Sequence, residues 1–248
     1  MSEARRRVAV FRPDDGRAAA ASGFLESLGV DPVIDPMLAV EPTGAVARSD
    51  ADVAILTSVT GVELVADAGW DSSDTRVCAI GESTASALRE AGYAVDVVPE
   101  VFSSAGLVET LEGTIDGDRV EVARSDHGSS VLTDGLEKAG AYVHETILYR
   151  LIRPEGSGRS TELAARRSLD GALFTSSLTV EHFLAAAKDR GVREEAIEGL
   201  TDAVVGAIGE PTRETIEAHG IAVDVVPETA DFEVLARAVV ERLRDTQV

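Results

Sequence analysis

Short apolar segments alternate with longer amphipathic segments along the whole chain. The short segments are rich in Val, Ile and Ala, which is typical of strands buried in a parallel sheet, and they cover residues 8–12, 52–57, 76–81, 94–98, 119–123, 171–175, 203–208 and 222–226. The longer segments are rich in Ala, Leu, Glu and Arg, which favour helices, and they cover residues 17–28, 59–68, 83–91, 103–112, 129–139, 159–167, 178–189, 211–218 and 231–244. This alternation predicts an α/β fold with doubly wound parallel sheets.

The second half of the chain repeats the first. Residues 79–100 read AIGESTASALREAGYAVDVVPE and residues 207–228 read AIGEPTRETIEAHGIAVDVVPE, so 13 of 22 positions are identical. Shorter matches extend the repeat, because Thr57-Ser58 corresponds to Thr175-Ser176 and Arg12 corresponds to Arg124 after a similar V-x-V run. A repeat of this length indicates a duplicated structural unit. We therefore predict two similar domains.

Two longer extended segments, 30–40 and 141–151, break the alternation at equivalent places in the two copies. A tandem duplication by itself suggests sequential domains, at about 1–116 and 117–248. If the extended segments instead cross between the domains, the two ends of the chain form one domain and the middle forms the other. The pattern of residues leaves both arrangements open.

The chain is strongly acidic. Its 248 residues carry 44 acidic against 23 basic side chains, which gives a formal charge of −21, and its lysines are Lys138 and Lys188 alone. This charge excludes general nucleic-acid binding through a basic face. An acid excess spread along the chain favours a protein that works at high salt, as in a halophilic archaeon, because ions screen the self-repulsion. The alternative is an ordinary acidic cytoplasmic protein.

Several features of other protein classes are missing from the sequence. No apolar run approaches the roughly 20 residues of a membrane span, and no signal-peptide core follows residues 1–7. There is no Walker-type phosphate loop, no dinucleotide-binding G-x-G-x-x-G and no G-x-S-x-G elbow. The single cysteine, Cys78, lies in an apolar run, and the histidines are not at metal-ligand spacing. We expect a cytoplasmic protein with no metal, no cofactor and no covalent nucleophile.

Candidate binding residues follow the predicted strands. In a doubly wound fold, ligands bind outside the carboxyl ends of the strands, and helix N-termini there attract carboxylates or phosphates. The residues at these positions are Arg12, Ser58, 81–84, Arg124, 176–177 and 209–212. Ser and Thr before a helix are also ordinary N-caps. An arginine at the end of a buried strand needs an anionic partner, and Asp14 and Asp126 are the structural alternatives to a ligand for Arg12 and Arg124.

The order and spacing of several short motifs resemble the uroporphyrinogen-III synthase family over nearly the whole chain. The motifs are A-I-G-E-S-T at 79–84, A-I-G-E-P-T at 207–212, F-R-P at 11–13, F-T-S-S at 174–177, and Arg124 followed by Tyr149-Arg150. The resemblance implies two flavodoxin-like domains that are interleaved in sequence and joined by a two-stranded β ladder. The implied domains are 1–36 with 154–248, and 42–141, and the implied linker strands are 37–41 and 142–153.

The resemblance also implies an activity. Members of the family cyclise the linear tetrapyrrole hydroxymethylbilane to uroporphyrinogen III without a cofactor, inverting the terminal pyrrole ring and losing water, in the biosynthesis of porphyrins, haem and cobalamin. The expected partner is this polycarboxylate alone, with no nucleic acid and no membrane, and the expected state is a monomer. A non-catalytic two-lobed protein that closes over a small ligand shares the duplicated lobes and is the alternative.

Site residues are implied by the same resemblance. Tyr149 matches a family tyrosine proposed to face the leaving hydroxyl, which makes it the expected catalytic residue, and Thr84 and Thr212 match the threonines that follow A-I-G. The expected substrate-binding residues are Arg12, Ser58, Thr84, Arg124, Ser176, Ser177 and Thr212. Glu82 and Glu210 depart from the neutral residues of many relatives and add negative charge beside the expected carboxylate sites.

Overall fold

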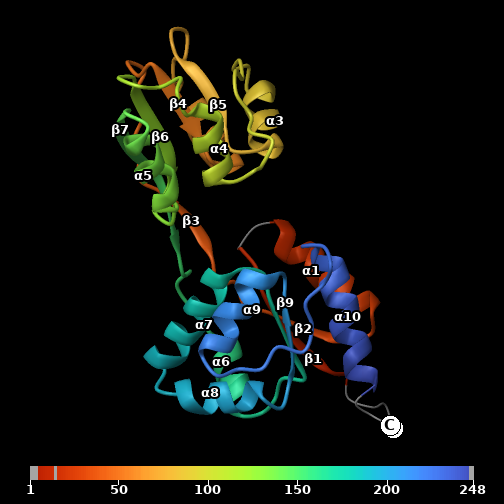
Figure 1. Cartoon of the computed structure of the whole chain (residues 1–248). Coiled ribbons are helices and arrows are strands. Elements are labelled where there is room, and N and C mark those ends of the chain that lie inside the picture. Colours follow the sequence, from red (N-terminus) through yellow and green to blue (C-terminus); the bar gives the residue numbers. More distant parts are fainter. Residues whose placement is uncertain (1–4, 14–15, 246–248) are drawn as a thin grey trace. The chain divides into compact units, whose positions relative to one another are not determined.

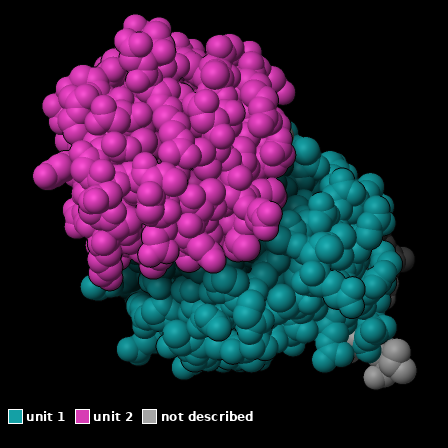
Figure 2. Space-filling model, turned by 45° about the horizontal axis from the view of Figure 1, so that its top comes forward, with its two compact units in different colours: residues 1–39, 152–248 teal, residues 40–151 magenta. Residues whose placement is uncertain are grey.

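The chain folds into two compact units that are interleaved in sequence. The computed structural model describes residues 5–13 and 16–245. Unit 1 consists of Met1–Ala39 with Ile152–Val248, and unit 2 consists of Val40–Leu151; Figure 2 gives each unit its own colour. Both ends of the chain therefore belong to one unit, and the sequential arrangement is wrong. The unit borders fall within the expected linker strands 37–41 and 142–153.

The sheet of unit 1 has the strand order β2-β1-β8-β9, and each neighbouring pair is parallel. Its strands are β1 (Arg7–Phe11), β2 (Asp31–Ile34), β8 (Gly171–Phe174) and β9 (Val204–Ala207). One face carries α1 (Gly16–Ser27) and α10 (Phe232–Asp245), and the other carries α6 (Arg159–Ala165), α7 (Ser177–Asp189), α8 (Arg193–Leu200) and α9 (Glu210–Ala218) (Figure 1). Each face has its own apolar core, which explains why the strands are continuous apolar runs.

The sheet of unit 2 has the order β3-β7-β6-β4-β5, and β7, β6, β4 and β5 are parallel. Its strands are β3 (Ala39–Pro42), β4 (Val53–Leu56), β5 (Arg76–Ala79), β6 (Arg119–Ser125) and β7 (Tyr142–Ile152). One core packs against α2 (Val59–Asp67) and α3 (Glu82–Glu90), and the other packs against α4 (Ser104–Leu111) and α5 (Ser130–Lys138) (Figure 1). Both units are thus three-layered α/β sandwiches, as predicted.

The segment expected to be a linker strand at 142–153 is for the most part a strand of the sheet. Tyr142 pairs with Arg119 and Tyr149 pairs with Ser125, so β7 lies beside β6 along the whole length of β6. β7 has 11 residues and β6 has 7, so β7 pairs with all of β6 and its last residues extend beyond the end of β6. On its other side β7 neighbours β3, which gives the two-stranded ladder that the resemblance implied.

Two predicted strands, 94–98 and 222–226, are not strands. Each makes one isolated parallel bridge, between Cys78 and Val97 and between Gly206 and Val225. In each case an aspartate of the segment accepts a hydrogen bond from the neighbouring strand, at 2.8 Å from the Val77 amide to Asp96 and at 2.8 Å from the Val205 amide to Asp224. The carboxylate takes the place of a ladder carbonyl, so pairing stops after one bridge. The same bonds in both units confirm the internal repeat.

No helix among residues 5–13 and 16–245 is long and apolar enough to cross a membrane.

Candidate functional site

The predicted site residues lie at the carboxyl ends of the strands of both units. In unit 2 they are Ser58 after β4, Thr84 in the helix after β5, Arg124 near the end of β6, and Tyr149 on β7. In unit 1 they are Arg12 after β1, Ser176 and Ser177 after β8, and Thr212 in the helix after β9. Parallel strands bring their carboxyl ends to one edge of a sheet, so each unit presents its set on one edge.

Ser58 and Tyr149 are in direct contact within unit 2. The Tyr149 phenol donates a hydrogen bond of 3.0 Å to the Ser58 Oγ, and the amide of Gly61 donates to the same oxygen at 3.0 Å. Ser58 is thus the N-cap of α2. A side chain at position 61 would lie 3.1 Å from the Ser58 Oγ, so a glycine keeps this oxygen accessible. The two residues are 91 positions apart and meet because a single strand, β6, separates β7 from β4.

Arg124 is held by protein groups. Its side chain is buried, its Nε donates to Glu145 Oε1 at 2.5 Å, and its Nη1 donates to the carbonyl of Ser129 at 2.6 Å. Gly128 makes room for it, because a Cβ at that position would lie 2.4 Å from the arginine side chain. Arg124 thus has a protein carboxylate as its anionic partner, but this carboxylate is Glu145 on the neighbouring strand and not Asp126.

Asp126, the partner suggested for Arg124 by the sequence, has other contacts. It accepts hydrogen bonds from the Leu151 amide at 3.0 Å and from His127 Nδ1 at 2.9 Å. Burial raises the pKa of the Asp126 carboxyl, but these hydrogen bonds outweigh burial, and the net pKa is below its usual value. Asp126 thus fixes the turn after β6 to β7 and does not neutralise Arg124.

Arg12 lies just beyond the end of β1 and is half-buried. Its guanidinium carbon is 4.5 Å from the centroid of the Phe232 ring, at the start of α10. This is a cation–π contact, which holds the side chain at the carboxyl edge of the sheet. Asp14, the carboxylate that the sequence offered as its structural partner, lies outside the described residues.

Thr84 and Thr212 occupy the same place in the two units and are both buried, at 4% exposure. They lie in the first turns of α3 and α9, and each helix starts after a glycine, Gly81 or Gly209, that provides no side-chain cap. The first-turn amides of these helices therefore have no side-chain acceptor at the N-cap, so the backbone, more than the threonine hydroxyls, is available to an anion.

The acidic residues beside these turns form ion pairs within their own helices. Glu82 bonds Arg89 at 2.7 Å, and Glu210 bonds Arg213. Their charges are thus offset locally, which reduces the repulsion that their position suggested for a carboxylate ligand.

Ser176 and Ser177 have separate roles in unit 1. Ser176 is the N-cap of α7 in a reciprocal capping box with Thr179, as the cap alternative predicts. The Ser177 hydroxyl donates to the carbonyl of Pro211 at 3.0 Å and accepts from Thr215 at 2.8 Å. Ser177 therefore ties the start of α7 to α9.

Exposed apolar side chains gather at the carboxyl edge of unit 2, a feature that the sequence did not reveal. Val59 starts α2, Val101 and Phe102 precede α4, and Val131 is in the first turn of α5. Their exposures are 40%, 62%, 64% and 51% in that order. We call these four residues the apolar rim. The Phe102 ring also contacts Gly81, where a Cβ would lie 3.3 Å from Phe102, so the rim adjoins the uncapped turn of α3.

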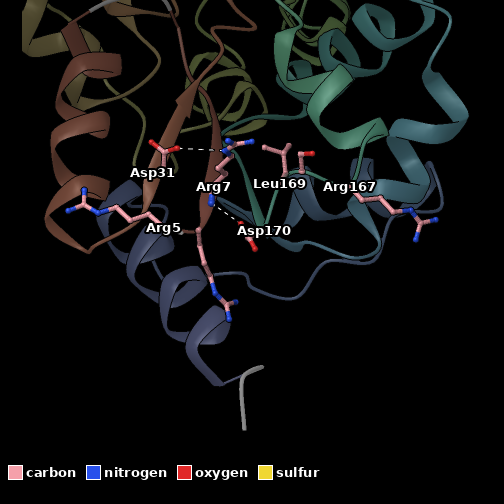
Figure 3. Close-up of a pocket in the computed structure, with 8 residues that line it drawn as sticks. Arg5, Arg7, Asp31, Arg167, Leu169 and Asp170 are labelled. Atoms are coloured by element: carbon pink, nitrogen blue, oxygen red, sulfur yellow. Dashed lines mark hydrogen bonds and ion pairs between the residues drawn. The ribbon is translucent and has the colours of Figure 1, made fainter. Parts of the chain in front are cut away.

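A cavity of about 710 Å³ lies at the opposite, amino-terminal edge of the sheet in unit 1. It is lined by Arg5, Arg6, Arg7, Asp31, Arg167, Ser168, Leu169 and Asp170. Figure 3 shows that Arg5 and Arg167 point away from one another, and Arg167 is bound to Asp202 at 2.6 Å. Arg5 and Arg167 therefore do not converge on a common point, and we do not assign the site to this cavity.

The structure adds no metal-binding group or reactive thiol to these sets. Among the described residues, no cluster of three or more His, Cys, Asp or Glu side chains has the arrangement of a metal site. Cys78 is fully buried, and burial raises the pKa of its thiol to about 12. It is therefore a core residue, as its apolar surroundings in the sequence predicted.

Comparisons with known proteins point to one family. The family model for uroporphyrinogen-III synthase HemD matches residues 19–237. A protein of Methanothermobacter thermautotrophicus, named provisionally for the same enzyme, is 35% identical over 237 residues, which cover 89% of this chain and 92% of that protein. The uroporphyrinogen-III synthase of Chlorobaculum parvum is 26% identical over 96% of this chain and 99% of that protein.

Solved structures show the same fold. A mutant uroporphyrinogen III synthase of Thermus thermophilus has a TM-score of 0.71 at 22% identity, covering 98% of this chain and all of that one. The enzyme of Helicobacter pylori has a TM-score of 0.64 at 15% identity, covering 96% and 99%. With the family model matching most of the described residues, the chain belongs to the uroporphyrinogen-III synthase family.

Proposed function

We propose that this protein is a lyase of tetrapyrrole biosynthesis that cyclises hydroxymethylbilane to uroporphyrinogen III, with inversion of the terminal pyrrole ring and loss of water. The observation that carries the proposal is the family match over residues 19–237. The ring closure breaks one C–O bond and one C–H bond and releases the hydroxyl and the hydrogen as water, and the inversion breaks one C–C bond while two C–C bonds form. The reaction is redox-neutral overall, so its chemistry requires no cofactor. Nothing favours the non-catalytic binding protein.

The substrate combines carboxylate side chains with flat apolar rings, and the carboxyl edges offer partners for both. The uncapped first turns of α3 and α9 supply backbone N–H groups for carboxylates, and the apolar rim supplies contacts for the rings. We propose the substrate-binding set Arg12, Ser58, Thr84, Arg124, Ser176, Ser177 and Thr212, in which Thr84 and Thr212 act through their backbone and Arg124 acts by fixing the turn after β6.

Finer features of the protein are also proposals. The formal charge of −21 supports an enzyme adapted to high salt, as in a halophilic archaeon, that acts in the cytoplasm as a monomer without a nucleic-acid or membrane partner. We propose that the chain crosses between the domains within the expected linker strands, at Ala39–Val40 and at Leu151–Ile152, where the two units divide. Limited proteolysis tests this, because cleavage should concentrate at these two crossings and spare the part of β7 that pairs with β6.

The decisive test of the function is the product. Purified protein is mixed with hydroxymethylbilane, and the isomers are separated after oxidation to porphyrins. Hydroxymethylbilane closes spontaneously to the I isomer, so accelerated formation of the III isomer is the expected result. Formation of the I isomer at the rate seen in buffer would exclude the proposed function, and saturable binding of the tetrapyrrole without turnover would favour the binding protein.

A further inference from the structure

We propose, resting on the proposed function, that Ser58 is the group that donates a proton to the departing hydroxyl. Tyr149 is then a positioning residue that donates a hydrogen bond, and in turn a proton, to Ser58. The resemblance to the family points to the tyrosine as the residue that faces the leaving group. The contacts of the two side chains assign them different places in one chain of hydrogen bonds.

Burial separates the two hydroxyl groups. Tyr149 is 6% exposed and belongs to the apolar core under α2 and α3. Ser58 is half-buried at the end of β4, and the next residue, Val59, is 40% exposed. A substrate at the carboxyl edge therefore reaches the serine before it reaches the phenol.

The hydrogen-bond capacity of the serine gives the direction of the chain. A hydroxyl group has one hydrogen to donate and two lone pairs that accept. The Ser58 Oγ accepts from the Gly61 amide at 3.0 Å and from the Tyr149 phenol at 3.0 Å. Both lone pairs are then in use, and the serine hydrogen remains to be donated toward the open edge. The donor order is Tyr149 to Ser58 to substrate.

This order provides a balanced proton transfer. As the C–O bond of the hydroxymethyl group breaks, its electron pair stays on the oxygen, the Ser58 proton moves to that oxygen, and the Tyr149 proton moves to Ser58. Water leaves, and the phenolate charge stays inside the protein. The substituted α carbon of the terminal pyrrole then bonds to the methylene carbon, and its bond to the bridging carbon breaks and re-forms at the free α carbon, which inverts the ring. The free α carbon loses its proton in that step, and the proton returns through Ser58 to Tyr149. No other reactant is consumed.

The second copy of the repeat contains a serine N-cap that receives no hydrogen bond from any tyrosine in the described part of the chain. Ser176, the counterpart of Ser58, accepts from the Thr179 amide at 3.2 Å, so it has the same capping role. Among the residues that the structure describes, no phenol is bonded to Ser176. Capping α2 therefore does not require Tyr149, and the phenol–serine contact is an addition specific to unit 2.

The test is a double-mutant cycle with Ser58→Ala and Tyr149→Phe in the intact enzyme, measuring kcat, KM and the isomer formed. We expect Ser58→Ala to lower kcat by about 10²-fold, at the lower end of general-acid effects because this leaving group departs readily. KM should rise by a smaller factor, since Ser58 also belongs to the proposed substrate-binding set. Tyr149→Phe should lower kcat about tenfold in the wild-type background, and it should lower kcat no further in the Ser58→Ala background. Ser58→Thr, which keeps the hydroxyl, should restore most of the loss.

The matched control is Ser103→Ala. Ser103 caps α4 with the same geometry, accepting from the Gly106 amide at 3.0 Å, so this variant loses an equivalent cap and should keep its turnover. A larger loss from Tyr149→Phe than from Ser58→Ala, or additive losses, would mean that the phenol contacts the substrate itself. Wild-type kcat in both single variants would overturn the relay while the III isomer still upheld the function. A wild-type protein that makes no III isomer would remove the function and the relay together.

Discussion

The buried guanidinium of Arg124 and the partly exposed carboxylate of Glu145 form an ion pair across two neighbouring strands, with 2.5 Å between Nε and Oε1. The arginine side chain is 6% exposed and the glutamate side chain is 35% exposed. Removing the arginine leaves the Glu145 carboxylate without its partner at a position that water reaches only in part.

Arg124→Ala should therefore lower the free energy of unfolding by about 2–3 kcal/mol, measured by urea denaturation. The control lies on the same strand, because Arg119 pairs with Asp52 at 3.1 Å with both side chains about half-exposed. Arg119→Ala should lower the free energy of unfolding much less, because water solvates both side chains of that pair. If Arg124→Ala instead kept full stability and raised KM, Arg124 would be a direct substrate ligand.

Salt should stabilise the fold. With 44 acidic and 23 basic residues, the folded chain repels itself, and the Debye length falls from about 10 Å at 0.1 M to about 3 Å at 1 M salt. Thermal melts in KCl from 0.1 to about 2 M should show a rising Tm. Sucrose at matched osmolarity separates screening from preferential exclusion. A Tm that is flat or falls with KCl would contradict the adaptation to high salt.

The Cys78 thiol should be unreactive in the folded protein. Its pKa is raised from 9.0 to about 12 by burial, so iodoacetamide at pH 8 should modify it only after denaturation, as measured by mass spectrometry. Alkylation of the native protein as fast as of the denatured one would contradict this.

The same shift has a consequence for stability. A raised pKa in the folded state stabilises the fold fully below the unfolded value and progressively less as pH rises toward the folded value. The free energy of unfolding should therefore fall above about pH 9, by about 2 kcal/mol at pH 10.5. The free energy of unfolding of Cys78→Ala should fall less over the same pH range. If it falls as steeply with pH as that of the wild type, other groups are responsible for the loss.

The apolar rim should contribute to substrate binding if the proposed function holds. Phe102→Ala removes an aromatic side chain that is 64% exposed, so it should raise KM by about tenfold, about 1.4 kcal/mol, and leave kcat and stability nearly unchanged. Tyr142 is the matched control, because it is 72% exposed and begins β7 at the opposite edge of the same sheet. Equal effects of Tyr142→Ala and Phe102→Ala would deny the rim a specific role.

Local patterns were sufficient to predict most of the fold. The alternation of apolar and amphipathic segments located β1, β4, β5, β6, β8 and β9 and the helices between them to within a few residues, except α8 (Arg193–Leu200), which was not predicted. It failed at 94–98 and 222–226 because Asp96 and Asp224 replace a ladder bond with a side chain, which apolar periodicity does not detect. The interleaving of the units came from the resemblance to the family, since both arrangements have the same local pattern.

The site was predicted less completely, because its contacts are long-range. Ser58 and Tyr149 were each chosen separately, and the bond between them depends on the order β7-β6-β4. Glu145 was missed because its pairing with Arg124 depends on strand register. A serine before a helix carries the same signal whether or not a tyrosine lies behind it, so sequence could not distinguish Ser58 from Ser176.

The interleaved chain has a consequence for the order in which the protein folds as it leaves the ribosome. Strand β1 must wait for β8, since Val8 pairs with Gly171, whereas unit 2 is complete once Leu151 has been made. Unit 2 is thus free to fold first during N-to-C synthesis, at about 5–20 residues per second. A folded insert with a fixed span replaces a long flexible loop, which lowers the entropy cost of joining β1 to β8. Truncations that end before β8 should therefore contain a structured middle and a first strand that lacks its β8 partner.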